Sequence, residues 1–551
     1  MATVGCIQNG FEKNQSRIRT TVETPFYGNN VMPVASVKEV YYLAKDSPGT
    51  IELSGMPVFE AEKMGLPEGA KVLLFNDGAV VGRCAAARRI VGEPNVKVDE
   101  YATKLREAVY GTRFRKLYRA EAIVGLHPDF MIKAHLLVPE GHENILYNWI
   151  LNFQYLDDCY SKIYQDSRVY PEGDIFIFSD PDWQHPEHPL GLAFFDPNHN
   201  CAAILGLRYF GEFKKGTLTL AWGTAARNGF LSCHGGLKRL KLHGGRNFVM
   251  AVFGLSGSGK STITHATHGG KYEITVLHDD AFVVNRDEGY SIALEPTYFD
   301  KTQDYSMDSE ASRFIVTLQN NGASIGKDGK LYAMMEDLRN GNGRAIRSRF
   351  WSPNRVDIMK DPINAIFWLM RDPTMPPVVK VTNPCLGSTL GATLATRRTT
   401  AERLAPGVDP DALVFEPYAN PFRVYPLSVD YEGFKTFLAS GVDCYILNTG
   451  DFMGKDIEAK LTLQIIENIA EEKPCFVPWD NFSDLQIMHL DGFMPDLSDK
   501  GYKEQFIARM NDRIKFIKGK ETERGGFDKL PPETIELLEK ILEEASHPKT
   551  K

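Results

Sequence analysis

The chain has 551 residues, of which 43% are hydrophobic and 24% are charged, a composition that excludes wholesale disorder or a fibrous repeat. Its length predicts two to four domains. With 63 lysines and arginines against 71 aspartates and glutamates, the net charge is −8, and no basic block is present, so general binding to nucleic acid is not expected. No run of 18 apolar residues occurs, and the first twenty residues lack an apolar core, so we expect neither a membrane span nor a secretory signal.

Short apolar runs alternate with turn signals in the first half of the chain. Residues 72–75 predict a strand, 76–78 a turn and 79–82 the returning strand. Residues 143–153 carry apolar side chains at helical spacing and predict an amphipathic helix. Buried strands are expected at 174–178 and 202–207, with a loop in the Pro- and His-rich stretch 180–189 between them.

The second half has a different pattern, with apolar runs of the β type at 248–253, 274–277, 365–370 and 444–447. Such continuous runs are typical of strands buried on both faces in an α/β core. A terminal helix is expected around 535–542, behind Pro531 and Pro532, since proline suits a helix start. We place the domain boundary in the basic, Gly-containing stretch 238–246, giving an N-terminal domain of residues 1–240 and a C-terminal domain of residues 241–551.

The eight cysteines are scattered and form no C-x-x-C pair; they are Cys6, Cys84, Cys159, Cys201, Cys233, Cys385, Cys444 and Cys475. This spacing favours reduced thiols over a disulfide framework or a structural zinc site. We therefore expect a cytoplasmic protein.

A glycine-rich segment directly after the predicted strand 248–253 fits the pattern G-x-x-x-x-G-K-[ST] in full. It consists of Gly254, Leu255, Ser256, Gly257, Ser258, Gly259, Lys260 and Ser261, and Thr262 continues into a predicted helix. Backbone N–H groups in such a turn surround phosphate oxygens, the lysine adds a positive charge, and the serine hydroxyl can bind Mg²⁺. The alternative is a chance Gly-rich turn, and the motif does not identify the reaction.

Two carboxylates, Asp279 and Asp280, follow the predicted strand 274–277. Beside a phosphate-binding turn, such a pair can hold divalent cations directly or through water. A solvated strand end or an acidic helix cap is the alternative interpretation.

Several ordered segments resemble the ATP-type phosphoenolpyruvate carboxykinases. Residues 208–216 (RYFGEFKKG) are similar to the family's R-Y-x-G-E-M-K-K signature, and residues 253–261 (FGLSGSGKS) are similar to its F-G-L-S-G-T-G-K-T loop. Gly82 and Arg83 resemble its early G-R-S-P-K-D-K segment, and residues 448–450 (NTG) with Lys455, Lys460 and Thr462 resemble its late N-T-G segment. The resemblance runs in family order from about residue 80 to about residue 465.

The resemblance implies a two-lobed α/β fold, with an N-terminal substrate-binding domain, a C-terminal P-loop mononucleotide-binding domain and an active site in the cleft. It implies a carboxy-lyase that converts oxaloacetate and ATP to phosphoenolpyruvate, CO₂ and ADP in gluconeogenesis or anaplerosis, with Mn²⁺ and Mg²⁺ as cofactors. The expected partners are these small molecules, without nucleic acid or membrane. The sequence does not indicate an oligomeric state.

Roles for individual residues follow from the same resemblance. Arg83 is expected to clamp the substrate carboxylate, and Tyr209 to face the CO₂ or the carboxyl of phosphoenolpyruvate. Lys215, His234 and Asp280 are expected to bind Mn²⁺, while Asp279 and Ser261 serve Mg²⁺. The remaining implied site residues are Lys260 and Lys301 at the transferred phosphoryl group and Glu295 and Thr462 at the nucleotide.

Other interpretations of these residues stay open. Lys214 and Lys215 could be a solvated pair, Tyr209 a buried core phenol and His234 a turn cap. The second substrate arginine is either Arg344 or Arg349, because residues 342–344 match the start of the family's N-T-R-x-x-Y-P segment and residues 349–353 match its end.

The phosphoryl donor and the reaction class also leave alternatives. Asp456 stands where the family has a nucleotide-contacting arginine, so the donor could be pyrophosphate or another nucleotide. A P-loop kinase for another small molecule or a protein hydroxyl would keep the glycine-rich loop, Asp279 and Asp280 but would not need Arg83, Tyr209 or Lys215. A nucleotide- or metabolite-sensing module that has lost turnover through changes such as Asp456 is the third alternative.

Overall fold

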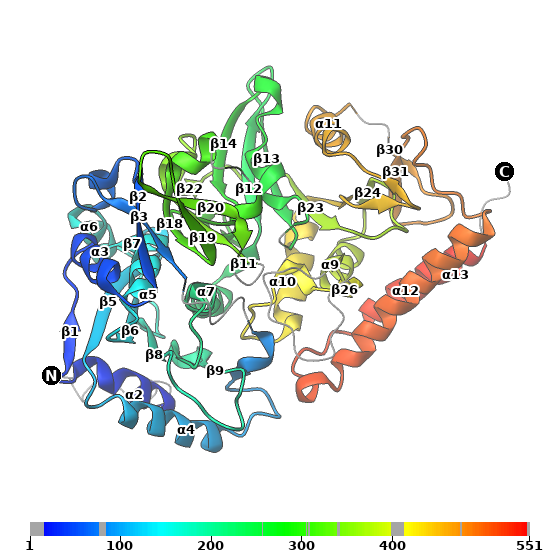
Figure 1. Ribbon diagram of the computed structural model, residues 1–551. Helices are drawn as coiled ribbons and strands as arrows, with labels where there is room; N and C mark the ends of the chain where they lie inside the picture. The colour runs from blue at the N-terminus through cyan, green and yellow to red at the C-terminus, as the bar shows by residue number, and fades with distance from the viewer. Residues whose placement is uncertain are drawn as a thin grey trace. The chain divides into compact units, whose positions relative to one another are not determined.

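The computed structural model describes residues 16–547 except 77–83, 256, 305, 307–308, 339–341, 398–412 and 474–475. The chain forms two compact units, shown together with their elements in Figure 1. The first unit comprises the chain up to Thr224 and the segment Leu294–Pro353. The second unit comprises Ala225–Ala293 and the described residues from Asn354 onward. The fold is therefore mixed α/β, as the sequence predicts.

The transition between the units differs from the single boundary expected near residue 240. The basic stretch 238–246 comprises the end of β12 (Gly236–Lys241) and the turn that leads to β13 (Asn247–Phe253), and these strands pair antiparallel within the second unit. The chain passes from the first unit to the second inside α7 (Phe210–Arg227) and later returns for residues 294–353. A polar, Gly-rich hairpin connection has the composition of a linker, which explains the difference.

The first unit contains two main sheets. The larger has the order β1 (Val31–Pro33), β5 (Leu117–His127), β6 (Phe130–Pro139), β8 (Ile175–Asp180), β10 (Cys201–Leu205), β9 (Leu192–Asp196) and β4 (Arg88–Ile90), with β7 (Gln154–Tyr155) beside β5. The smaller has the order β17 (Tyr298–Lys301), β21 (Arg344–Arg347), β18 (Ile315–Gln319), β3 (Lys71–Phe75) and β2 (Thr50–Pro57). A hairpin is formed by β19 (Asn321–Ile325) and β20 (Leu331–Leu338). The predicted strands at 72–75, 174–178 and 202–207 are thereby confirmed as parts of β3, β8 and β10, and the return at 79–82 lies outside the described residues.

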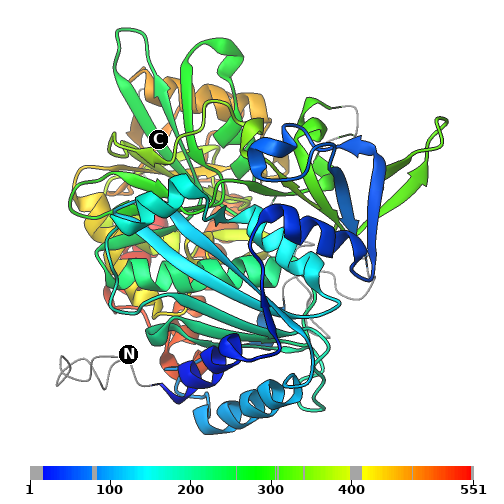
Figure 2. The same ribbon diagram turned by 90° about the vertical axis from the view of Figure 1, so that its left-hand side faces the viewer.

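Helices α2 (Arg17–Glu23), α3 (Val37–Asp46), α4 (Val98–Gly111), α5 (Glu143–Asn152) and α6 (Asp158–Gln165) complete the first unit, together with the first part of α7. Figure 2 shows α2 and α4 side by side. The helix predicted at 143–153 is confirmed as α5, but its predicted amphipathic character is wrong because all ten residues are buried. Its polar side chains are bonded internally: Asn148 accepts from Thr317 at 2.9 Å, and Asn152 donates to Glu295 at 2.6 Å.

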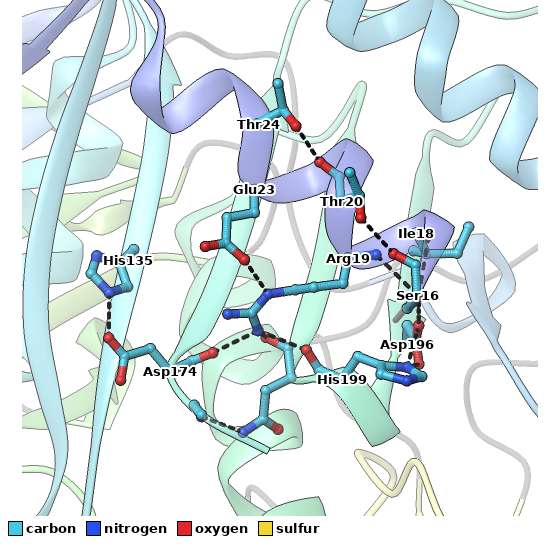
Figure 3. Close-up of polar contacts among 12 residues, drawn as sticks. Ser16, Ile18, Arg19, Thr20, Glu23, Thr24, His135, Asp174, Asp196 and His199 are labelled. Atoms are coloured by element: carbon cyan, nitrogen blue, oxygen red, sulfur yellow. Dashed lines mark hydrogen bonds and ion pairs between the residues drawn. The ribbon is translucent and has the colours of Figure 1, made fainter. Parts of the chain in front are cut away.

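Helix α2 is fixed to the larger sheet by a polar network (Figure 3). Ser16 caps the helix by accepting bonds from the backbone N–H groups of Ile18 and Arg19. The Arg19 guanidinium donates to the carbonyls of Asp174 and His199, both at 2.7 Å, and its Nε donates to Glu23 at 2.6 Å. Beside it, His135 bonds to the Asp174 carboxylate at 2.9 Å. Because the charged Arg19 guanidinium bonds to two carbonyls and a carboxylate at once, it fixes the position of α2 on the sheet.

The second unit is built on a sheet of order β14 (Glu273–His278), β12, β13, β23 (Ala365–Met370), β27 (Asp443–Asn448), β24 (Val378–Val381), β31 (Leu485–Met488) and β30 (Phe476–Pro478). The four apolar runs of the sequence are confirmed as β13, β14, β23 and β27. Strands β13, β23 and β27 are parallel neighbours, so their carboxyl ends lie at one edge of the sheet.

A second sheet of this unit has the order β11 (Phe230–His234), β15 (Ala281–Asn285), β16 (Ser291–Ala293) and β22 (Ile358–Met359). Two hairpins are formed by β25 (Ala395–Arg397) with β26 (Leu413–Phe415) and by β28 (Asp451–Phe452) with β29 (Lys455–Asp456). The helices are α8 (Lys260–His265), α9 (Pro384–Ala392), α10 (Leu427–Ala439), α11 (Ala459–Ala470), α12 (Lys500–Lys520) and α13 (Glu533–Ser546). The terminal helix is confirmed as α13, which packs along α12 (Figure 1).

No helix within the described residues is both long enough and apolar enough to cross a bilayer. The described cysteines form no disulfide with one another; they are Cys84, Cys159, Cys201, Cys233, Cys385 and Cys444. Cys6 and Cys475 lie outside the described residues.

Candidate active site

The glycine-rich segment 254–261 joins β13 to α8 in the second unit. Gly257 and Gly259 adopt φ of +84° and +91°, a backbone region that favours glycine. A Cβ on Gly254 would lie 2.2 Å from Ser258 Oγ and 2.9 Å from Leu369 Cβ, so a larger residue would not fit. Ser258 closes the turn by donating from its N–H and its hydroxyl to the Leu255 carbonyl, at 3.0 and 2.7 Å. The strand, turn and helix that the motif requires are therefore present; Ser256 lies outside the described residues.

Two side chains from the neighbouring parallel strands hold this turn. Arg371, directly after β23, donates to the Gly257 carbonyl, and Thr449, directly after β27, donates to the Ser258 carbonyl at 2.8 Å. Both contacts follow from the common edge at which parallel strands end. The N-T-G segment containing Thr449 was singled out in the sequence. Arg371 was missed, although its place immediately after the apolar run 365–370 was the available signal.

Lys260, His234 and Asp280 meet beside this turn. The Lys260 ammonium lies 3.2 Å from Asp280 Oδ1, and His234 Nε2 lies 2.9 Å from the same oxygen. His234 Nδ1 faces the Ala419 carbonyl, which only accepts hydrogen bonds, so Nδ1 carries a proton. In a neutral imidazole, Nε2 would then direct its lone pair at the carboxylate. The contact is favourable only when the imidazole is protonated or when a cation binds both groups.

Asp279 lies next to this cluster and is 4% exposed. Its Oδ2 lies 3.5 Å from His265 Nε2. Burial alone would raise the pKa of the Asp279 carboxyl, but the His265 hydrogen bond and the nearby positive charges hold that pKa well below its usual range. Asp279 is therefore a buried carboxylate that stays ionised at neutral pH.

The other nucleotide-side residues have different surroundings. Ser261 and Thr262 are exposed in the first turn of α8. Thr462 is buried in the first turn of α11, where its N–H bonds to the Glu458 carbonyl at 3.2 Å. Asp456 is exposed in β29.

In the first unit, the predicted substrate residues gather around Phe299 of β17. The Tyr209 ring lies 6.4 Å from the Phe299 ring, and Lys214 Nζ and the Arg344 guanidinium each lie 5.4 Å from its centre. Lys301 and Arg344 are opposite partners in the antiparallel pairing of β17 with β21. Cations over an aromatic face are attracted by its quadrupole. The structure thus brings together Tyr209, Lys301 and Arg344.

Lys214 and Lys215 are neighbours on α7 with opposite surroundings. Lys214 is fully buried and its Nζ lies 2.9 Å from Glu295 Oε1, also fully buried, while Asn152 donates to Glu295 Oε2 at 2.6 Å. Lys215 is half-buried, with Nζ 5.8 Å from the Trp222 ring. The alternative of a solvated lysine pair is therefore wrong for Lys214. Glu295 is the counter-ion of Lys214 in this structure.

The two candidate substrate arginines also differ. Arg344 is 7% exposed and donates from Nε to Asn342 Oδ1 at 2.9 Å. Arg349 begins a short 3₁₀ turn and donates to Gln154 Oε1 at 3.0 Å. Arg83 lies outside the described residues, but the N–H of the following residue, Cys84, donates to Glu212 in the first turn of α7.

Comparison with known proteins gives a consistent result over most of the chain. A family model described as "Phosphoenolpyruvate carboxykinase" matches residues 68–489. A protein of Aeropyrum pernix named "Phosphoenolpyruvate carboxykinase (ATP)" is 26% identical over 345 residues, which cover 58% of this chain and 67% of that protein. One of the same name in Dictyostelium discoideum is 24% identical over 212 residues, covering 35% of this chain and 36% of its own. A Salinibacter ruber protein, "Phosphoenolpyruvate carboxykinase (ATP) 2", is 23% identical over 206 residues, covering 35% and 38%.

Proposed function

Because the chain belongs to the phosphoenolpyruvate carboxykinase family of enzymes, we propose that it catalyses the reversible conversion of oxaloacetate and ATP to phosphoenolpyruvate, CO₂ and ADP. Family membership confirms the resemblance read from the motifs. The convergence of Lys260, His234 and Asp280 beside the glycine-rich turn carries the proposal. Lys260 supplies a cation that can bind phosphate, and His234 and Asp280 beside it supply a pair of ligands for a metal ion.

The glycine-rich turn and Lys260 are proposed to bind the triphosphate. The N–H groups at the start of α8 and the positively charged Lys260 would neutralise the charge that spreads over the phosphoryl oxygens in the transition state. Arg371 and Thr449 bond the turn's carbonyls and so turn its N–H groups toward a ligand. Ser261 and the ionised Asp279 fit Mg²⁺, which prefers oxygen ligands and water.

His234 and Asp280 are proposed to hold Mn²⁺. Nδ1–H of His234 is fixed by the Ala419 carbonyl, which leaves the Nε2 lone pair for a metal, and Asp280 offers carboxylate oxygen 2.9 Å away. A divalent ion held by these two residues would supply positive charge that stabilises the negative charge developing on the substrate oxygen during loss of CO₂. Lys215 is the third ligand that the resemblance implies, and as a ligand it must be neutral.

The residues around Phe299 are proposed to bind the dianionic substrate. Arg344 and Lys301 lie on one pair of strands with Tyr209 near the same ring, whereas Arg349 bonds Gln154 elsewhere. We therefore assign Arg344, together with Arg83, to the substrate carboxylates and Lys301 to the transferred phosphoryl group. We further propose that Glu295 pairs with Lys214 and does not contact the nucleotide directly, since both side chains are fully buried and their charged atoms lie 2.9 Å apart.

The proposal extends to the setting of the enzyme. We take the two compact units as the two lobes of the family fold, the cytoplasm as its compartment and gluconeogenesis or anaplerosis as its role. Scattered cysteines that form no disulfide within the described part of the chain support the compartment.

The test is metal-dependent formation of oxaloacetate from phosphoenolpyruvate and bicarbonate, followed by reduction of the product with malate dehydrogenase and NADH. Parallel reactions contain ADP, GDP, phosphate or no acceptor. We expect turnover with ADP, and a strict need for bicarbonate and Mn²⁺. Turnover with phosphate alone would identify pyrophosphate as the donor, as the replacement of a family arginine by Asp456 allows. ADP binding without turnover under any condition would refute the proposed activity.

A further inference from the structure

The loop between β8 and β9 contains a histidine–carboxylate cluster that the proposed reaction does not use. In the sequence His185-Pro186-Glu187-His188, the two imidazoles and the Glu187 carboxylate place one ligand atom each within 4.8 Å of one another. All three residues belong to the first unit. Two imidazoles and a carboxylate are a common ligand set for transition metals.

Aromatic neighbours hold the two imidazoles in place. The Trp183 ring stacks on His185 at 5.5 Å with an angle of 14° between the planes, and the Tyr101 ring of α4 lies 5.7 Å from His188. The two imidazole centres are 5.4 Å apart. Nε2 of His188 is shielded from solvent and has no hydrogen-bond partner among the described residues. A shielded, unbonded ring nitrogen is costly unless it binds something.

A cation already lies at the carboxylate of this cluster. Lys104 Nζ is 2.8 Å from Glu187 Oε2 and 2.6 Å from Glu100 Oε1. If a metal ion bound Glu187, the ammonium would keep Glu100 as its partner.

We propose that His185, Glu187 and His188 form a binding site for a divalent transition-metal ion of the Zn²⁺ type, with water as the remaining ligand. Bonds of about 2.0–2.2 Å require the three ligand atoms to approach to about 3.5 Å. The loop must therefore close slightly around the ion, and Glu187, whose side chain is 64% exposed, can move to do so.

A metal ion at this site would restrict the motion of the loop between β8 and β9, which also contacts Arg208 of the family signature through Asp182. Asp182 of the same loop bonds Arg208 at 2.7 Å, Arg115 at 2.9 Å and His142 at 2.9 Å. Arg208 directly precedes Tyr209, the proposed substrate residue. An ion that fixes residues 185–188 would restrict the loop that positions Arg208.

The experiment is a titration with Co²⁺ of the full-length protein carrying His234→Ala, which removes a ligand of the proposed Mn²⁺ site, followed by displacement with Zn²⁺. Visible absorption reports Co²⁺ bound in a low-coordinate site. We expect one Co²⁺ to bind and to be displaced by Zn²⁺. The double variant His185→Ala/His188→Ala should lose at least tenfold in affinity, whereas His489→Ala, which removes an imidazole 73% exposed in the second unit, should bind as the wild type does.

Lys104→Met provides a test in which the ligands are intact. Because it removes the cation that competes for Glu187, we expect Co²⁺ to bind several-fold more tightly. Equal affinity in the wild type and the double histidine variant, or weaker binding in Lys104→Met, would overturn the proposal. Circular dichroism shows whether the double variant folds, and if it does not, Lys104→Met and the single variant Glu187→Gln decide the question. None of these measurements depends on carboxykinase activity, so the site and the proposed function can fail separately.

Discussion

Lys238 of β12 is a buried cation whose removal should change how the stability of the second unit depends on pH. The residue is 1% exposed, and its ammonium donates to the carbonyls of Ile263 at 2.6 Å and Ala266 at 3.3 Å and to His268 Nε2 at 2.8 Å. The two carbonyls belong to the carboxyl end of α8, the helix that Lys260 begins. His268 in turn bonds Glu467 of α11 at 2.9 Å. We chose Lys238→Met because methionine keeps much of the side-chain volume and removes the charge.

The magnitude follows from the pKa. Burial lowers the pKa of Lys238 from 10.5 to about 7, against a smaller raising effect of Glu467. Below pH 7 the wild type therefore carries the full cost of burying the ammonium, about 5 kcal/mol at about 1.4 kcal/mol per pKa unit. Between pH 7 and 10.5 the unfolded chain binds one proton more than the folded protein, so stability rises with pH. From pH 7 to pH 9 this contribution amounts to about 2–3 kcal/mol.

The variant lacks this titration but also leaves three buried acceptors without their donor, at about 1–3 kcal/mol each. Near pH 7 the two effects oppose each other, and by pH 9 the wild type should have gained about 2–3 kcal/mol relative to Lys238→Met. The assay is urea unfolding of both proteins at pH 7, 8 and 9. Lys241→Met is the matched control, since Lys241 lies on the same strand with its side chain 49% exposed. Parallel pH profiles for wild type and Lys238→Met would refute the reasoning.

Four further predictions concern the proposed active site and His135 of β6. Lys260→Met should lower kcat about 10²–10³-fold in the oxaloacetate assay, and turnover within twofold or so of the wild type would contradict its role. Lys215→Gln should weaken Mn²⁺ binding about tenfold or more in a titration while nucleotide affinity stays nearly constant; the reverse order would exclude Lys215 as a ligand. Arg344→Met should raise KM for oxaloacetate about 10–100-fold and Arg349→Met should change it little; equal effects would contradict the assignment. Burial lowers the pKa of His135, but the hydrogen bonds of His135 to Asp174 and Glu121 outweigh burial, so the pKa is raised overall. The stabilisation from protonated His135 should therefore be complete below pH 6.5 and be lost as the pH rises. Identical shifts in Tm between pH 6 and 8 for the wild type and His135→Phe would disprove this.

The parts of the fold that the sequence predicts are those set by local pattern. β13 and β23 are continuous apolar runs because they lie inside a sheet with parallel neighbours, and the glycine-rich turn follows from positive φ at Gly257 and Gly259. The helix at 143–152 was also predictable from its spacing. Its complete burial was not, because the polar groups of Asn148 and Asn152 bond residues more than 140 positions away.

The division into units and several site contacts depend on distant parts of the chain. Residues 294–353 join the first unit because β18 pairs with β3, a contact between residues 317–319 and 73–75. Arg371 reaches the glycine-rich turn only because β23 lies beside β13. No local pattern predicts which strands become neighbours, so such contacts require the structure.

The pairing of Lys214 with Glu295 determines how α7 presents its other residues. Successive residues of a helix are rotated by about 100° and residues three apart lie on nearly the same face. With Lys214 fixed to a fully buried carboxylate, Glu212 and Lys215 therefore share a different face of α7. Glu212 uses that face to bind the N–H of Cys84, next to Arg83. Breaking a buried ion pair is strongly unfavourable, because the partner that remains is an unpaired charge away from water. The buried ion pair of Lys214 with Glu295 thus fixes the rotation of α7, and this rotation sets the position of Lys215, the proposed metal ligand.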